Sequence, residues 1–276
     1  MNNDLLRVFE TESDYDSAKP DFVYPTVSYV RDVDDVRYMT KPWRNYFFIE
    51  ALADGMTVAL NNTSQGINAP ANELEYSTGQ QVWRRLPNNI ASPAINTGER
   101  IYLRGNATVG DAANDILGIG FFNISRPCNV GGNIMSLLFN DDFEDKTDLT
   151  GYGKAFFGLF TQQSIVNASE LILPATTLTE GCYYGMFAGC TLLTTAPALP
   201  ATTLTEACYM AMFAGCSNLN NITMLATDIS ASDCLNGWVT TVSSTGTFVK
   251  NSALSVDTIG RGNSGIPNGW TVVDAE

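Results

Sequence analysis

Histidine is absent from the sequence. It is the commonest general base and metal ligand, so Ser-His-Asp catalysis, Cys-His catalysis and imidazole metal sites are excluded. No phosphate-binding glycine loop opens a helix. Glycosidase chemistry needs only two carboxylates, but the acidic residues gather in the first 60 positions and in residues 141–148, without other site features. We expect no catalytic residue, no cofactor, no metal and no enzymatic activity.

Positive charge is scarce: 15 Lys and Arg oppose 29 Asp and Glu, for a net charge of −14. Such a chain suits neither nucleic acid nor an anionic membrane surface. The apolar runs fall short of the roughly 18–20 residues that a membrane helix needs, so membrane insertion is not expected. The start, "MNNDLLRVFETESDYDSAKP", has no basic segment followed by an apolar core. We therefore expect no secretory signal, and folding in a cytoplasm.

An internal repeat is the strongest pattern present. "LPATTLTEGCYYGMFAGC" (173–190) returns as "LPATTLTEACYMAMFAGC" (199–216), 26 residues later. A degraded third copy, "LATDISASDCLNGWV" (225–239), keeps the register. Upstream, "AFFGLF" (155–160) matches "CYYGMF" (182–187) with a slip of one residue. A fixed period of this length with apolar columns is typical of a leucine-rich solenoid, in which stacked coils bury the columns against each other.

Each unit predicts a short strand at "LILP" or "PALP", then a capped turn, then a short helix. In the turn, Thr177 and Glu180 have the spacing of a capping box. In the helix "ACYMAMFAGC", Cys208, Met212 and Phe213 fall close to one face. The expected repeat core consists of Cys182, Met186, Phe187, Cys190, Cys208, Met212, Phe213, Cys216, Cys234 and Trp238.

The repeat also bears on the six cysteines, because all except Cys128 lie within it. Cysteine packs as a small hydrophobe and is often fully buried, so core thiols are the favoured interpretation. Disulfides are the alternative that the even count suggests. Zinc is disfavoured, because the spacing is C-x7-C and no histidine accompanies it.

The units resemble the BspA-like leucine-rich repeats of Bacteroidetes surface proteins and of proteins of their phages. The phrases LPATTL, CYxxMFxGC and xxLxxxPxLP carry the resemblance, over about residues 150–225. The ending "GTFVKNSALSVDTIGRGNSGIPNGW" (246–270) is similar to the closing segment of such arrays, a strand, a turn and an aromatic lid. "LEYSTGQQVWRRL…INTGERIYLRGNA" is similar to a module that precedes them.

The first half of the chain predicts other structures. Residues 46–62 have the pattern of a hairpin with its turn at Asp54-Gly55. Short candidate strands then follow one another, which predicts a small sandwich-like or barrel-like module: "ELEYST", "QQVWRRL", "ERIYLRGNA", "ILGIGFFNIS" and "GGNIMSLLF". "FNDDFED" (139–145) lacks the alternating ligands and closing Glu of a calcium loop, so we expect a solvated loop.

Together these patterns predict a mainly β chain with short helices. The expected parts are a β-rich attachment or oligomerisation region (1–62), a small β module (63–148), the repeat solenoid (149–250) and a C-terminal cap (251–276). Tyr183, Tyr184 and Tyr209 are candidate recognition residues on the solenoid surface, although the adjacent Tyr183 and Tyr184 cannot both face the core.

The resemblance, which points towards crAss-like phages, implies a non-enzymatic virion structural protein. We expect a short head fibre or capsid-associated decoration on the virion surface, made and folded in the bacterial host cytoplasm. Its N-terminal region would bind capsid or tail proteins, its repeats would recognise a host-surface glycan or protein, and the chain would be a homo-oligomer. The alternatives are a bacterial surface adhesin with BspA-like repeats and a tail- or baseplate-associated receptor-binding protein. Contact between the N-terminal region and another virion chain would favour the virion hypotheses over the adhesin hypothesis.

Overall fold

The chain is mainly β with short helices, as predicted. The computed structural model describes residues 45–61, 73–79, 82–106 and 120–275, together with the strand backbones of 6–9, 26–30 and 35–39. The strands are β1 (Leu6–Phe9), β2 (Thr26–Val30), β3 (Asp35–Met39), β4 (Phe47–Ala51), β5 (Val58–Asn61), β6 (Glu73–Ser77), β7 (Arg84–Arg85), β8 (Arg100–Asn106), β9 (Phe121–Ile124), β10 (Cys128–Asn133), β11 (Ile165–Ile172), β12 (Asn221–Met224), β13 (Thr247–Lys250) and β14 (Thr271–Asp274). The helices are α2 (Ser136–Phe139), the 3-10 helix η2 (Asn140–Asp142) and α3 (Val256–Ile259).

The first three strands form a sheet of their own. β1 pairs with β2 in parallel, and β2 pairs with β3 antiparallel, from Thr26 opposite Met39 to Val30 opposite Asp35. An attachment role was predicted for residues 1–62. The side chains of residues 1–44 lie outside the described residues, so the structure does not show what they contact.

A six-stranded sheet, in the order β11-β10-β4-β8-β6-β7, and the two-stranded sheet β5-β9 share one core. Phe47 of β4 stacks on Phe122 of β9 with ring centroids 5.9 Å apart, and Phe122 stacks on Phe160 at 5.8 Å. All three rings are buried. Burying such rings stabilises the fold by roughly 2–3 kcal/mol each, so these contacts hold the module against the first coil of the repeats.

The hairpin predicted for residues 46–62 is wrong. The turn forms at Asp54-Gly55, where Gly55 has φ +75°, but β4 and β5 enter different sheets. Both edges of β4 are occupied, by β8 and by β10, and β5 pairs with β9 instead. The turn is therefore a corner between two sheets.

Two predicted domain boundaries fall inside this sheet. β4 precedes the boundary at residue 62, and β11 follows the boundary at residue 148, yet β10 pairs with both. The module therefore includes residues from 46 onward, and it continues into the repeats without a break in the sheet. The two boundaries were misplaced because the strand pairings join segments far apart in the sequence, and local sequence patterns do not reveal such pairings.

"GGNIMSLLF" is only partly the strand expected. β10 ends at Asn133, whose side-chain oxygen accepts a hydrogen bond from the Met135 N–H (3.0 Å), and α2 follows. The buried Ser136 hydroxyl donates to the Leu103 carbonyl (2.8 Å) and accepts from the Phe47 N–H (3.0 Å). A buried hydroxyl needs such partners, and these tie α2 to two strands of the sheet.

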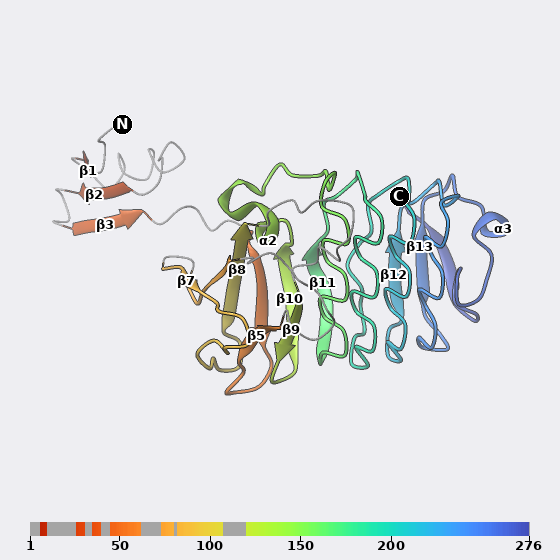
Figure 1. Ribbon diagram of the computed structural model, residues 1–276, viewed down its shortest axis with the longest axis horizontal. Coiled ribbons are helices and arrows are strands. Elements are labelled where there is room, and N and C mark those ends of the chain that lie inside the picture. The colour runs from red at the N-terminus through yellow and green to blue at the C-terminus, as the bar shows by residue number, and fades with distance from the viewer. Residues whose placement is uncertain are drawn as a thin grey trace.

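Beyond β11, successive coils stack in parallel. Bridges join Asn167 to Thr195 and Thr195 to Asn221, after which β12, β13 and β14 pair in parallel. Figure 1 shows β8, β10, β11, β12 and β13 following one another along the long axis. We call residues 149–275 the coil stack, the side that carries these strands its sheet face, and the opposite side its turn face.

The turn face does not contain the predicted helix. Between residues 181 and 190, every second backbone N–H donates to a carbonyl of the same coil. The Tyr184 N–H, for example, donates to the Gly181 carbonyl (3.1 Å). The N–H groups between them donate to carbonyls of the next coil. The Gly185 N–H, for example, donates to the Met210 carbonyl (2.9 Å). Every fourth residue has positive φ, which ends each turn before a helix can propagate. The side chains therefore point inward in pairs with a period of four: Cys182 and Tyr183, Met186 and Phe187, then Cys190.

The predicted capping box is wrong for the same reason, because no helix begins at Thr177. Its N–H donates to the Thr147 carbonyl (3.1 Å), and Glu180 lies 3.7 Å from the Lys154 ammonium. The next threonines instead bridge coils: the Thr179 hydroxyl donates to the Tyr152 carbonyl (3.0 Å), and Thr205 to the Thr179 carbonyl (2.9 Å).

The C-terminal segment continues the stack. Trp238 donates its indole N–H to the Gly265 carbonyl (2.9 Å), and Trp270 donates to the Ser243 carbonyl (2.7 Å). Both rings are buried. β14 pairs with β13, so the predicted cap (251–276) contributes a further strand as well as an aromatic cover over the last coil.

Candidate functional site

The candidate site is a line of side chains across the sheet face. The strand registers and bridges align one residue from each successive strand. Because paired residues of neighbouring strands point to the same side, these side chains share one face. We call this line the polar row: Arg100, Glu50, Asn129, Asn167, Thr195, Asn221, Thr247 and Thr271.

The sequence neighbours of the row explain why it faces outward. Cys128, Ala196, Ile222 and Phe248 each directly precede or follow a row residue, and all four are buried in the core. Since side chains alternate along a strand, burial of these neighbours turns the row toward solvent. Neighbouring strands lie about 4.8 Å apart, so the row from Asn129 to Thr271 extends over about 24 Å.

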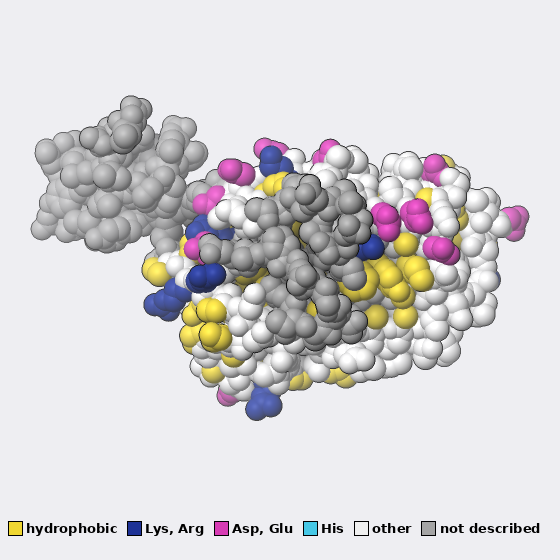
Figure 2. All heavy atoms as spheres, viewed as in Figure 1, with side chains coloured by type: hydrophobic (Ala, Val, Ile, Leu, Met, Phe, Trp, Pro, Cys, Tyr) yellow, Lys and Arg dark blue, Asp and Glu magenta, His cyan; other side chains and the backbone are white. Residues whose placement is uncertain are grey.

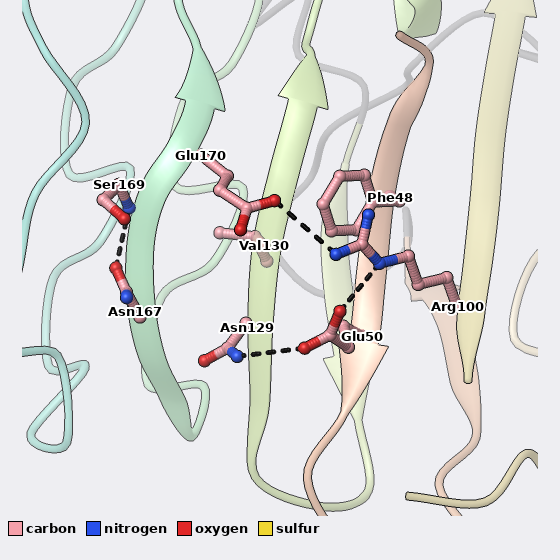
Figure 3. Close-up of a pocket in the computed structure, with 8 residues that line it drawn as sticks. All are labelled: Phe48, Glu50, Arg100, Asn129, Val130, Asn167, Ser169 and Glu170. Carbon is pink, nitrogen blue, oxygen red and sulfur yellow. Dashed lines mark hydrogen bonds and ion pairs between the residues drawn. The ribbon is translucent and has the colours of Figure 1, made fainter. Parts of the chain in front are cut away.

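One end of the row forms a small charged cluster (Figure 3). The Arg100 guanidinium lies over the Phe48 ring, 3.9 Å from its centroid, and its Nε donates to Glu50 (2.7 Å). Glu170 approaches the same guanidinium at 3.6 Å. Asn129 donates its amide N–H to the other Glu50 oxygen (3.3 Å). The one cation is thus shared between two carboxylates, so the cluster has no free positive charge and carries a net negative charge.

A hollow of about 20 Å³ lies among these residues and reaches Asn167 and Ser169. That volume holds about one water molecule or one hydroxyl group. The Asn167 side-chain oxygen Oδ1 accepts from the Ser169 backbone N–H (2.8 Å), which fixes the orientation of the Asn167 amide. Chemically, the site can orient polar groups through hydrogen bonds.

The prediction that Tyr183 and Tyr209 are recognition residues on the surface is wrong. Tyr183 and Tyr209 are each only 1% exposed, and their rings stack in the core with centroids 5.9 Å apart. Burial raises the pKa of both hydroxyls well above its ordinary value. The period of four turns Tyr183 inward and Tyr184 outward. Tyr184 is half-buried on the turn face, edge-on to Phe157 at 4.9 Å.

The predicted repeat core lies entirely in the interior: Cys182, Met186, Phe187, Cys190, Cys208, Met212, Phe213, Cys216, Cys234 and Trp238 are all buried. The cysteines are free thiols. Burial raises the pKa of Cys128 and Cys190 to about 12 and that of Cys208 to about 11. The Cys190 and Cys216 thiols donate to backbone carbonyls of the preceding coil, at 3.0 and 3.1 Å. These thiols are packed as core groups.

The acidic segment 139–145 is only partly the solvated loop expected. Asp141 accepts from the Tyr46 hydroxyl and forms an ion pair with Arg104 at 2.8 Å, and Phe143 is buried. Asp142, Glu144 and Asp145 are exposed. In the described part of the chain, three or more Cys, Asp or Glu side chains nowhere converge as a metal site would require.

The turn face offers a second, more apolar surface. Phe157, Tyr184 and Met210 follow one another in adjacent coils and are half-buried. Figure 2 shows hydrophobic side chains gathered on one face of the coil stack, with acidic side chains beside them. Among the residues that the structure describes, no helix has the length and apolar character to cross a membrane.

The polar row was not predicted from the sequence. Its partial signal is the 26-residue spacing of Thr195, Asn221 and Thr247, each beside a buried residue. Asn129, Asn167 and Thr271 break that spacing, so only the strand registers reveal them. Comparisons with protein-family models, with curated proteins and with solved structures found no match to this chain.

Proposed function

We propose that this chain is a non-enzymatic structural protein of a bacteriophage particle, a short head fibre or capsid-associated decoration. In this proposal residues 149–250 form a leucine-rich-repeat solenoid of the BspA-like type, displayed for recognition of a host surface. The N-terminal region joins the chain to capsid or tail proteins. The displayed part is a homo-oligomer, in keeping with the closed symmetry of most soluble oligomers.

The observation that carries the proposal is the parallel stacking of the coils. Alternate N–H groups of each coil bond to carbonyls of the next, as from Tyr183 to Cys208 and from Tyr209 to Cys234, both at 3.0 Å. This ladder satisfies the backbone without helices, and it supports a solenoid whose sheet face is an extended surface. The phage resemblance of the repeat phrases adds the setting in which such a surface would be displayed.

Gold-labelled antibodies against residues 149–250, applied to purified phage particles, test the proposal. We expect label on intact particles, and loss of label when residues 1–44 are deleted from a chain that is still produced in soluble form. Incorporation of the deleted chain at the normal level would contradict attachment through the N-terminal region. Label on the bacterial envelope and not on particles would contradict the virion proposal and support the adhesin.

A further inference from the structure

We propose that the polar row binds an extended, uncharged polysaccharide that lies across the strands, along the axis of the coil stack. This inference deepens the display role proposed above and rests on it. The ligand class follows from the free hydrogen-bonding capacity, the spacing, the charge and the apolar border of the row.

The free hydrogen-bonding capacity lies in the C-terminal half of the row. Within the described residues, the side chains of Thr195, Asn221, Thr247 and Thr271 make no hydrogen bond, whereas Asn129 and Asn167 are engaged. Each threonine hydroxyl can donate and accept, and the asparagine amide offers both kinds of group. Sugar hydroxyls also donate and accept, so they can satisfy every one of these side chains.

The spacing favours a polymer over a single small molecule. Successive row residues are about 4.8 Å apart, because they sit on neighbouring strands. A pyranose ring in an extended chain advances by a similar length. A regular polymer can therefore place one hydroxylated unit opposite each coil, and about five units would cover the row from Asn129 to Thr271.

Charge selects against anionic glycans. Arg100, the cation of the row, is held by Glu50 and Glu170. From Asn129 to Thr271 the row has no charged residue, and the chain carries a net charge of −14. An acidic polysaccharide would be repelled by the whole molecule and would find no free cation in the row.

An apolar border completes the match. At the C-terminal end of the row, two positions further along the strands, Val249 and Val273 pair side by side and point to the same face as the row. Val273 is 46% exposed. Sugar rings present C–H groups on their faces and hydroxyls at their edges. A chain can thus set its hydroxyls on the polar row and its C–H groups on the valines.

Titration calorimetry on the purified full chain tests this inference. The probes are neutral gluco-, xylo- and manno-oligosaccharides of two to six units, with polygalacturonate as the anionic comparison. We expect at least one neutral series to bind, with affinity rising with length up to about five units, and polygalacturonate not to bind.

The variant T195V/T247V removes two hydroxyls from the row while keeping shape and strand preference. We expect at least tenfold weaker binding with an unchanged melting temperature. T202V, at an exposed threonine in the loop after the strand segment of the same coil, should bind as the original chain does.

Failure of every neutral series to bind, equal binding by T195V/T247V, or preference for polygalacturonate would overturn the inference. These results concern the isolated chain, so they are distinguishable from failure of the virion proposal, which the particle labelling reports.

Discussion

Gly185 and Ala211 occupy equivalent positions in adjacent coils, and both have positive φ, +60° and +53°. The Gly185 N–H donates to the carbonyl of Met210, the residue just before Ala211 (2.9 Å). The left-handed conformation costs a non-glycine residue about 1–2 kcal/mol. One coil thus has glycine at this position, which adopts positive φ without strain, whereas the next coil has alanine, which does not.

The variant A211G should therefore stabilise the fold by about 0.5–1 kcal/mol, since relief of the left-handed strain exceeds the extra entropy that glycine loses on folding. G185A should destabilise it by a similar amount, because an added Cβ meets only the Ala188 Cβ, at 3.9 Å, and conformation alone decides the cost. Urea unfolding of each variant measures both changes. A188G, at a position without positive φ, is the matched control and should be destabilising. Loss of stability in A211G would contradict the account of the turn face.

The Tyr183 hydroxyl is buried and has no hydrogen-bond partner among the described residues. An unsatisfied buried hydroxyl costs about 1–3 kcal/mol. Y183F should therefore leave the free energy of unfolding unchanged or raise it by up to about 1 kcal/mol, as measured by urea unfolding. Y184F, at the half-buried neighbour, should have no effect. If Y183F lost more than about 1 kcal/mol, the hydroxyl would have a partner, such as a buried water.

The buried thiols predict alkaline destabilisation. Burial raises the pKa of Cys128 and Cys190 to about 12, against an ordinary value of 9.0. Below pH 9 these thiols are neutral in both states. Between pH 9 and 12 the unfolded chain releases protons that the folded chain retains, so the free energy of unfolding falls as pH rises. The slope approaches about 1.4 kcal/mol per pH unit for each such thiol.

Urea unfolding from pH 8 to 11 measures how steeply the free energy of unfolding falls with pH. The variant C190A removes one buried thiol, so it should reduce this slope by the contribution of that thiol. Iodoacetamide gives an independent readout at pH 8, where the folded chain should react only after denaturant is added. Rapid labelling of the folded chain at pH 8, or a free energy of unfolding that stays constant up to pH 11, would show that the thiols are not buried.

The repeat core was predictable because its pattern is local. Cys208, Met212 and Phe213 recur 26 residues after their counterparts, and they are buried. The helix was predicted wrongly because residues at i, i+4 and i+5 share a face both with 3.6 residues per turn and with a period of four. Positive φ at every fourth residue decides between these structures. Glycine marks these positions in the first copy, at Gly181, Gly185 and Gly189, but the second copy has alanine at Ala207 and Ala211.

Pairing between distant strands was the part that the sequence could not supply. Nothing local shows that β4 pairs with β8 and β10 in place of β5. The polar row depends on the same distant registers, including the irregular one between Asn129 and Asn167. The burial of the repeat core was therefore predictable, whereas most of the candidate site was not.

A cryo-EM map of purified phage particles that carry the chain would show whether the coil stack is displayed on the particle. We expect density for a stack of parallel coils projecting from the particle, with the N-terminal end against a capsid or tail protein and the polar row open to solvent. Absence of the chain from particles, or a map in which the coils lie buried within the shell, would contradict this expectation.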